Sequence, residues 1–334
     1  MGEIKKSIEE LEKLVTDILV AHKTSESNAQ CVAKALVAAE VEGQKGHGLS
    51  RVPSYAAQAR TGKVDGFADP KIIPVSEAAL RIDVQHGFAF PAFNAAADAL
   101  VEVAEKSGIA AASLANSHHC GMLGYHAERI ARKGLIAIIF SISLKAFAPW
   151  GGKEAVFGTN PTPFPAPRKD SDPLVIDLSL SKVARGKVKV AYEAGEPIPE
   201  GWALDKDGNQ TTNAEDAMKG TMVPMGEGKG AALVLMVEIL SAALSASHFG
   251  FEASSFFTPT GLSPDIGQLI IAIAPNPLSN NCFFERLETL IEAILKQDGT
   301  RLPGSGKAAK REDATKNGLS LDSKKYDDLV ALLD

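Results

Sequence analysis

The middle of the chain alternates between two kinds of apolar segment, and this alternation constrains the fold more than any other feature. Residues 91–107 show the helical period and end at Gly108. Apolar runs at 109–115 and 135–143 are typical of buried strands, with a helix expected over about 124–133 between them. Strands interleaved with helices predict an α/β domain. No GxGxxG follows any predicted strand, so the fingerprint of the Rossmann fold is missing.

Both ends of the chain are predicted to be helical. Apolar positions repeat with the helical period over residues 4–22, and an alanine-rich helix is expected over about 27–42. In the C-terminal part, helices are predicted over about 283–296 and 323–333, around a Gly- and Lys-rich link, RLPGSGKAAKRE. The loop that contains PWGGKEAVFGTNPTPFPAP is expected to hold one short strand. Other elements are strands at 174–178 and 268–274 and a long apolar helix at 230–247.

Composition excludes several classes of function. The 334 residues are 45% hydrophobic and 23% charged, as in ordinary globular proteins, and the net charge of −6 argues against non-specific nucleic-acid binding. The most apolar run, 231–244, is interrupted by Glu238 and is shorter than the roughly 20 residues of a membrane span. The N-terminus has no signal-peptide pattern. We therefore expect no membrane partner. The three cysteines have no disulfide spacing, which predicts a cytoplasmic location: Cys31, Cys120 and Cys282.

The segment from Glu42 to Tyr55 has the residue types of a substrate site. His47 lies between two glycines, and Arg51 and Tyr55 follow at intervals of four residues. Histidine exchanges a proton near neutral pH, and arginine holds a carboxylate through two parallel hydrogen bonds. If His47 opens a helix, all three side chains share one face. The alternative is a glycine-flanked turn with a merely hydrogen-bonded histidine, and the segment alone favours neither.

A second constellation, Asn116 to His126, follows a predicted strand and opens a predicted helix. Backbone N–H groups at such a helix start can bind an anion, and glycines allow close approach of a ligand. Four of its side chains suggest zinc: His118, His119, Cys120 and His126. However, adjacent histidines on one strand point to opposite faces, so we predict no metal.

Two lysine-containing segments resemble phosphate loops but fail the motif. GEGKGAA and GSGKAAK lack the glycine spacing and the Ser/Thr that a P-loop requires. Lys229, at the start of the long apolar helix, is either a phosphate contact or an exposed surface lysine. Asp177 closes the apolar strand LVID, where α/β proteins commonly place ligand contacts, although a helix cap is an equal alternative.

Six motifs in series resemble one known family. They are GHGLSRVPSY, NSHHCGMLGYHAERIA, APWGG, FGTNP, VIDLSLSKVARGK and GEGKGAALVLMVE. In this order, over almost the whole length, they resemble the type 2 malate/L-lactate dehydrogenase family. Within it, GHGLSRVPSYAAQ is most similar to the reductases of Δ1-pyrroline-2-carboxylate and Δ1-piperideine-2-carboxylate.

The resemblance implies a non-Rossmann α/β fold with a mainly antiparallel sheet. It implies a helical domain built from both chain ends, residues 1–75 and 280–334, and a cofactor- and substrate-binding domain over 76–279. It also implies a homodimer with the active site between the domains, and NADPH or NADH as cofactor, with NADPH slightly favoured.

The resemblance assigns roles residue by residue. His47 and His119 correspond to proton-handling histidines, and Arg51 to the arginine that binds the substrate carboxylate, with Tyr55 and Thr159 as further substrate contacts. The expected cofactor contacts are Cys120, Gly121, Met122, Leu123, Gly124, Asp177, Leu178, Ser179, Lys229, Gly230 and Arg301. In members with a proposed Ser-His-Asp relay, a serine precedes the histidine, where this chain has Gly46. Lys187 takes the place of the aspartate and is a third catalytic candidate.

The activity that the resemblance implies is reduction of a cyclic imino acid by hydride transfer to C2. Δ1-pyrroline-2-carboxylate would give L-proline, and Δ1-piperideine-2-carboxylate would give L-pipecolate. The missing relay agrees with this substrate, because a protonated imine already carries the charge that draws hydride. The alternative with the same machinery is a dehydrogenase of malate, lactate, ureidoglycolate or a related 2-hydroxy acid. A zinc-dependent hydrolase and a non-catalytic NADPH-binding module are minor alternatives.

Overall fold

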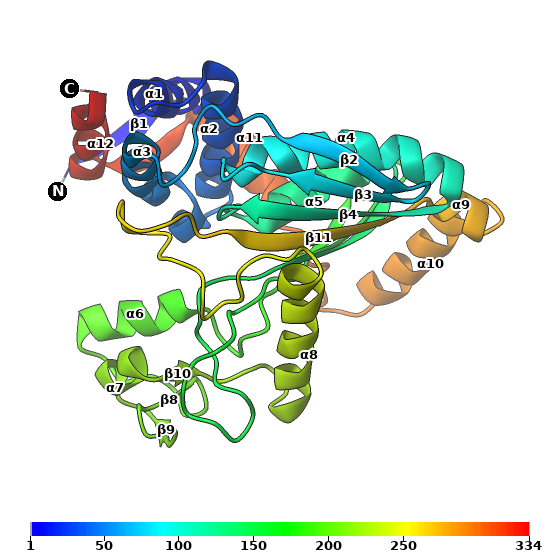
Figure 1. Ribbon diagram of the computed structural model, residues 1–334. Coiled ribbons are helices and arrows are strands. Elements are labelled where there is room, and N and C mark those ends of the chain that lie inside the picture. Colours follow the sequence, from blue (N-terminus) through cyan, green and yellow to red (C-terminus); the bar gives the residue numbers. More distant parts are fainter. Residues whose placement is uncertain (1, 334) are drawn as a thin grey trace.

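The computed structural model describes residues 2–333, which fold around a five-stranded sheet (Figure 1). The strand order is β2-β3-β4-β11-β5, and only the β3–β4 pair is parallel. The predicted α/β class with a mainly antiparallel sheet is therefore confirmed. The strands are β2 (Lys71–Ser76), β3 (Ala79–Asp83), β4 (Ile109–Ser117), β5 (Ile136–Ser141) and β11 (Ile266–Ile273).

Helices cover both faces of this sheet (Figure 1). On one face, α4 (Ala89–Ser107) and α5 (Leu123–Arg132) bury Phe93, Leu100 and Ile130 against the strands. On the other, α8 (Gly228–Glu238) continues as a π-helix over Ile239–Ala243 and packs on β11 and β5. The predicted helices and strands of the central region are confirmed, including β7 (Leu174–Ile176) and the short β6 (Phe164–Ala166).

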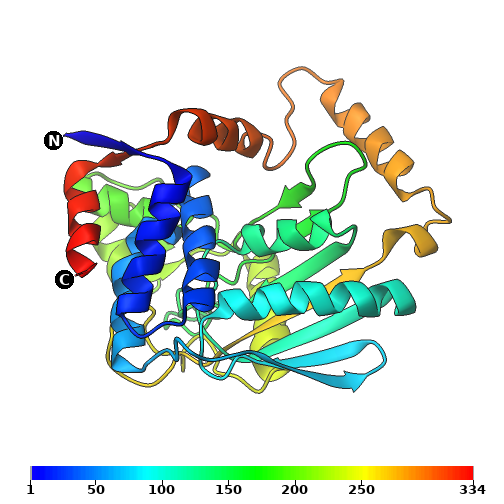
Figure 2. The same ribbon diagram turned by 90° about the horizontal axis from the view of Figure 1, so that it is seen from above.

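The two ends of the chain meet (Figure 2). β1 (Glu3–Lys6) pairs with β12 (Leu319–Asp322), and both lie beside α1 (Ile8–Ala21) and α12 (Ser323–Val330). Ser7 and Glu10 form a capping box at the start of α1. α2 (Glu26–Val41) and α3 (Val52–Thr61) complete this helical unit. Its core joins α1, α2, α3 and Leu329 of α12. The exact division at residues 75 and 279 stays a prediction.

Several elements differ from the prediction. Residues of the expected link form α11 (Lys307–Asn317), and its position depends on ion pairs with residues far away in the sequence. The hairpin β2–β3 was not predicted, because every residue of β2 is exposed and the strand shows no alternating pattern. A small lobe was also missed: α6 (Arg185–Ala194), β8 (Ala203–Leu204), β9 (Gln210–Thr211), α7 (Ala214–Lys219) and β10 (Thr221–Met222). The remaining helices are α9 (Pro275–Leu278) and α10 (Phe283–Leu295).

Two further observations concern membrane-spanning helices and the cysteines. Within residues 2–333, no helix is both long enough and apolar enough to cross a membrane. The three cysteines are unpaired, with Cys31 half-buried, Cys120 buried and Cys282 exposed.

Candidate active site

The segment with His47 and Arg51 forms two short turns rather than one helix. His47 ends a 3₁₀ turn (Lys45–His47), Arg51 ends a second (Leu49–Arg51), and Tyr55 lies in the following helix, α3. Gly48 separates the turns, where an added Cβ would lie 2.3 Å from a carboxylate oxygen of Glu40. Of the two alternatives for this segment, the structure has the glycine-flanked turn and not the helix from His47, because Gly48 has non-helical backbone angles (φ −97°, ψ −139°).

Tertiary packing nevertheless places these side chains beside His119. The His47 and His119 rings stack with centroids 5.5 Å apart. The Tyr55 hydroxyl lies 2.5 Å from His119 Nδ1, and the Gly121 N–H donates to the same nitrogen at 3.4 Å. A backbone N–H must donate, so Nδ1 is the unprotonated nitrogen, Tyr55 donates to it, and Nε2 of His119 carries the proton. Nε2 itself has no hydrogen-bond partner in the described chain.

Arg51 is held firmly but keeps a free donor. Its Nε donates to the carbonyl oxygen of Gly46 at 2.6 Å, and its guanidinium lies over the ring of Phe257 at 4.4 Å from the centroid. Its Nη1 is buried and has no partner among the described residues. An orphaned donor on a buried cation is costly unless an anion satisfies it. Arg51 is thus arranged to receive a carboxylate.

Burial keeps the two stacked histidines neutral. Burial and, to a smaller extent, the Arg51 cation lower the pKa of His47 to about 4. Burial also holds the pKa of His119 well below its ordinary value. No carboxylate of residues 2–333 offsets either effect on His47. Near pH 7 both rings are therefore neutral.

The other two histidines of this region support the structure. His118 Nε2 donates to Gln58 Oε1 at 3.0 Å, and His126 Nε2 donates to the carbonyl oxygen of Cys120 at 3.0 Å. The His126 ring also stacks on Phe93 at 4.3 Å. Within the described residues, no three His, Cys, Asp or Glu side chains converge as a metal site. The zinc alternative has no geometric support here.

The buried histidines predict a loss of stability in acid. Burial lowers the pKa of His126 to about 4 from an ordinary 6.5, so the unfolded chain takes up this proton first. Its contribution to stability is complete above about pH 6.5 and is lost as the pH falls towards 4. In this window H126F should flatten the pH dependence of the unfolding free energy by about 1.4 kcal/mol per pH unit. Denaturant unfolding of both proteins between these pH values measures the slopes, and equal slopes would contradict the prediction.

The turn Cys120–Gly124 connects the histidines to Asp177. Gly121 has φ +66°, which favours glycine, and the Gly124 N–H donates to Asp177 Oδ2 at 3.1 Å. A Cβ on Gly124 would lie 2.4 Å from that oxygen. Burial raises the pKa of the Cys120 thiol to about 12, which makes it a poor nucleophile. The missing side chain of Gly124 thus admits the Asp177 carboxylate, and the role of this turn as a cofactor contact stays a prediction.

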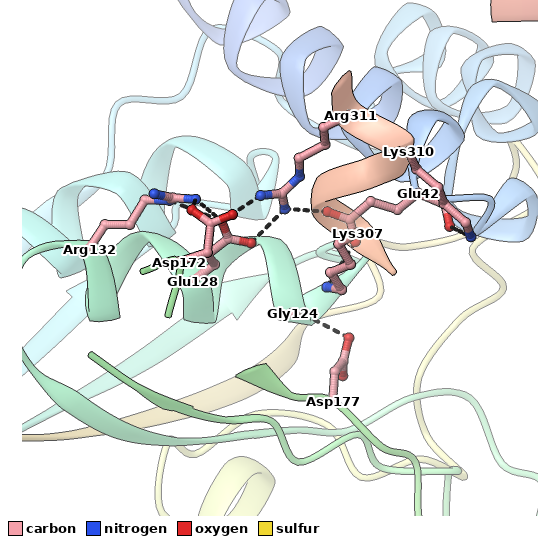
Figure 3. Close-up of polar contacts among 9 residues, drawn as sticks. All are labelled: Glu42, Gly124, Glu128, Arg132, Asp172, Asp177, Lys307, Lys310 and Arg311. Atoms are coloured by element: carbon pink, nitrogen blue, oxygen red, sulfur yellow. Dashed lines mark hydrogen bonds and ion pairs between the residues drawn. The ribbon is translucent and has the colours of Figure 1, made fainter. Parts of the chain in front are cut away.

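Ion pairs fix α11 beside this turn (Figure 3). The buried carboxylates of Glu42 and Glu128 both accept hydrogen bonds from Arg311. Lys307 Nζ lies 2.8 Å from Glu42 Oε2, and Lys310 Nζ donates to the Glu42 carbonyl oxygen at 2.7 Å. The network continues through Arg132, which pairs with Glu128 and Asp172. It places Lys307 near Asp177. Burial raises the pKa of the Asp177 carboxyl group, and the Lys307 cation offsets part of this rise.

A cavity of about 240 Å³ lies between β7 and the turn that precedes α11. Arg168, Lys307 and Arg311 line it together with backbone of Gly304 and Ser305. Its acidic lining residues are Glu128 and Asp172. Each of these cations is paired with a carboxylate, Arg168 with Glu288 and both Lys307 and Arg311 with Glu42. Cationic side chains beside a glycine turn are nevertheless the groups that bind the phosphates of a nucleotide. The described residues therefore fit a dinucleotide without a Rossmann fold.

Hydrogen bonds connect further predicted site residues to the segment that contains Asp177. Thr159 Oγ1 lies 3.1 Å from Ser143 Oγ, and its carbonyl oxygen accepts from the Leu180 N–H. This places Thr159 beside the segment with Asp177, Leu178 and Ser179. The Met225 N–H donates to the Leu180 carbonyl oxygen, so the turn before α8 also lies beside this segment. A Cβ on Gly230 would lie 1.7 Å from the Met225 oxygen, so only glycine fits there.

Three residues that were predicted to belong to the site make no contact with its other members. Lys187 on α6, Lys229 at the start of α8 and Arg301 are exposed, and their side chains make no hydrogen bond or ion pair in the described chain. Their assigned roles stay predictions. Conversely, the sequence reasoning missed residues that complete the site, namely Gln58, Lys63, Phe256, Phe257 and Lys307. The pair of phenylalanines in the polar run ASSFFTP was the one local signal for them.

G124A tests the cofactor side of the site. The added methyl group must displace Asp177, because 2.4 Å is far inside van der Waals contact. We expect the Kd for NADPH to rise roughly tenfold or more, the effect of about 1.4 kcal/mol or more of strain. Titration of NADPH fluorescence measures it, with G186A on α6, where the backbone is helical and an added Cβ meets nothing within 4 Å, as the control. Unchanged NADPH affinity in G124A would rule this turn out as a cofactor contact.

Fold and site together define an α/β enzyme with an arginine that keeps a free donor beside neutral histidines, and with a separate cavity lined by cations. The family model described as malate/L-lactate dehydrogenase matches residues 6–330. The chain belongs to this family. It is therefore an oxidoreductase that depends on NAD(P)H, and the family assignment made from the six motifs is confirmed.

Individual relatives differ in the substrate they are named for. A (2R)-3-sulfolactate dehydrogenase (NADP(+)) of Chromohalobacter salexigens is 48% identical over 92% of each chain. A Δ1-pyrroline-2-carboxylate/Δ1-piperideine-2-carboxylate reductase of Pseudomonas putida is 37% identical over 97% of this chain and 95% of its own. The crystal structure of the Δ1-piperideine-2-carboxylate reductase from Pseudomonas syringae superimposes with a TM-score of 0.93 at 34% identity, over 98% and 99% of the two chains.

Proposed function

We propose that the enzyme is an NADP(H)-dependent dehydrogenase of a small 2-hydroxy acid, with 3-sulfolactate as the first substrate to test. The observation that carries this proposal is the unpartnered Nη1 of Arg51 beside the neutral His47. The 48% identity to a sulfolactate dehydrogenase supports the same substrate class. The cyclic imino acid predicted from the motifs becomes the second candidate, because its named relatives are less similar.

In this proposal each side chain has a stated task. Arg51 binds the carboxylate of the substrate, which satisfies its orphaned donor. His47 accepts the proton of the 2-hydroxyl group, for which its low pKa keeps it ready. Tyr55 holds His119 in the tautomer whose Nε2–H donates a hydrogen bond to the same oxygen. NADP⁺, when bound, would supply the acceptor for the hydride of C2. Lys307 and the turn Cys120–Gly124 would hold its nucleotide part.

One observation favours the imino acid as the second candidate. His47 has no carboxylate beside it, and Gly46 replaces the serine of the proposed relay, so the ring is rarely protonated at neutral pH and seldom carries a proton to donate. Reduction of a ketone needs a proton donor as the alkoxide forms. A protonated imine needs none, since it carries its proton already. Reduction of Δ1-pyrroline-2-carboxylate would then require Arg51 more than His47.

The test is a steady-state assay that follows NADPH absorbance in both directions. 3-Sulfolactate, malate and lactate are offered with NADP⁺, and Δ1-pyrroline-2-carboxylate and Δ1-piperideine-2-carboxylate with NADPH. We expect the highest kcat/KM for a 2-hydroxy acid and a preference for NADP⁺ over NAD⁺. Efficient turnover of the imines alone would overturn the first candidate in favour of the second. The homodimer remains a prediction that sedimentation velocity would test.

A further inference from the structure

The loop 254–262 forms one wall of the candidate site. The Phe256 ring is buried, and its centroid lies 5.0 Å from that of His119. The next residue, Phe257, covers the guanidinium of Arg51 at 4.4 Å. Two neighbouring residues of the loop thus contact the proton-handling part and the carboxylate-binding part of the site. The position of this loop therefore affects both parts.

Side chains, rather than backbone pairing, hold the loop in place. Within residues 2–333, no backbone–backbone hydrogen bond involves 254–262. Instead, five of its carbonyl oxygens accept hydrogen bonds from the end of α3 and the residues after it. Gln58 Nε2 donates to Phe256 at 2.8 Å, and Thr61 Oγ1 donates to Pro259 at 2.7 Å. The other three bonds come from Lys63.

The ammonium of Lys63 lies at the centre of the loop. Lys63 is only 4% exposed, and its Nζ donates to the carbonyl oxygens of Ser255, Thr258 and Thr260 at 2.7, 3.1 and 3.1 Å. An ammonium has three N–H donors, so all of them are used. No described carboxylate pairs with it. Because a buried charge is costly unless its donors are satisfied, the ammonium favours the loop conformation that presents these three carbonyls.

We propose that Lys63 is a positioning residue that fixes the loop 254–262, and through it Phe256 and Phe257, against His119 and Arg51. The inference rests on the proposed function, since it makes this loop part of the substrate wall. Without the ammonium the loop loses three of the five side-chain hydrogen bonds given above, and Arg51 loses its aromatic cover. The binding of NADPH should change little, because Gly124, Asp177 and Lys307 make their contacts elsewhere.

K63M tests the proposal, because methionine keeps an unbranched stem and removes the donors. We expect KM for the acid substrate to rise roughly tenfold or more, as for loss of a charged hydrogen bond, while the Kd for NADPH stays within about twofold. Chymotrypsin should cut after Phe257 roughly tenfold faster than in the wild type, because the loop opens more often. K63R keeps the charge and should recover part of both effects. K71M, at an exposed lysine of β2, is the matched control.

The outcomes separate this proposal from the proposed function. If the wild type turns over none of the acids and imines, the proposed function fails, and the cleavage rate after Phe257 alone decides on Lys63. Wild-type cleavage and KM in K63M would overturn the proposal. So would an equal weakening of NADPH binding and a lowered Tm, because Lys63 would then be a general structural residue.

Discussion

R51A should raise KM for the acid substrate by roughly 100-fold, since removal of one partner from a buried charge pair costs about 2–5 kcal/mol. Its guanidinium is anchored by the Gly46 carbonyl and by Phe257, so the free Nη1 has a fixed direction. R51K should recover only part of the loss, because an ammonium lacks the planar fork that matches a carboxylate. Steady-state kinetics with both substrate classes measure the effect.

R60A provides the matched control for Arg51. Arg60 lies exposed on α3, the helix that follows Arg51, and its side chain pairs with no described residue. Its removal should leave KM within about twofold of the wild type, as for surface substitutions. If R51A kept the wild-type KM as well, the carboxylate would bind elsewhere and the proposed function would lose its main support.

H47N should lower kcat for oxidation of a 2-hydroxy acid by roughly 10²- to 10⁴-fold, the usual contribution of a general base. For an imine the loss should be much smaller, because its proton is already in place. The ratio of the two losses therefore also separates the candidate substrates. H86N is the control: His86 is exposed, and its φ of 58° is one that asparagine tolerates well.

The same histidine sets the expected pH dependence. A base must be unprotonated, and burial together with Arg51 lowers the pKa of His47 to about 4. The kcat/KM for hydroxy-acid oxidation should therefore show no acidic limb of this histidine between about pH 6 and 8, and should fall only as the pH approaches 4. A limb near the ordinary pKa of 6.5 would mean that His47 is less buried or has a carboxylate partner in the working enzyme.

Much of the architecture was predictable from local patterns. The helices α1, α4, α5, α10 and α12 have clear apolar periods, and α2 and α8 are rich in alanine or other apolar residues. The strands β4, β5 and β11 are continuous apolar runs. Such patterns reflect burial of one face or of a whole strand, so they are visible without tertiary contacts. α11 and β2 carry no such pattern, because ion pairs or one neighbouring strand hold them in place. Both were therefore missed, together with β3 and the small lobe from α6 to β10.

The sequence by itself determined which residues were available for chemistry. It determined the order of His47, Arg51 and Tyr55, the glycines of the turn 120–124, and the family, because these depend on residue identity and short spacing. Tertiary structure alone decided that Tyr55 meets His119 and that Lys63 meets a loop almost 200 residues further along the chain. It also decided that His47 is neutral, because burial and the nearby Arg51 lower its pKa. Contacts and desolvation depend on the packed environment, which no local pattern of residues contains.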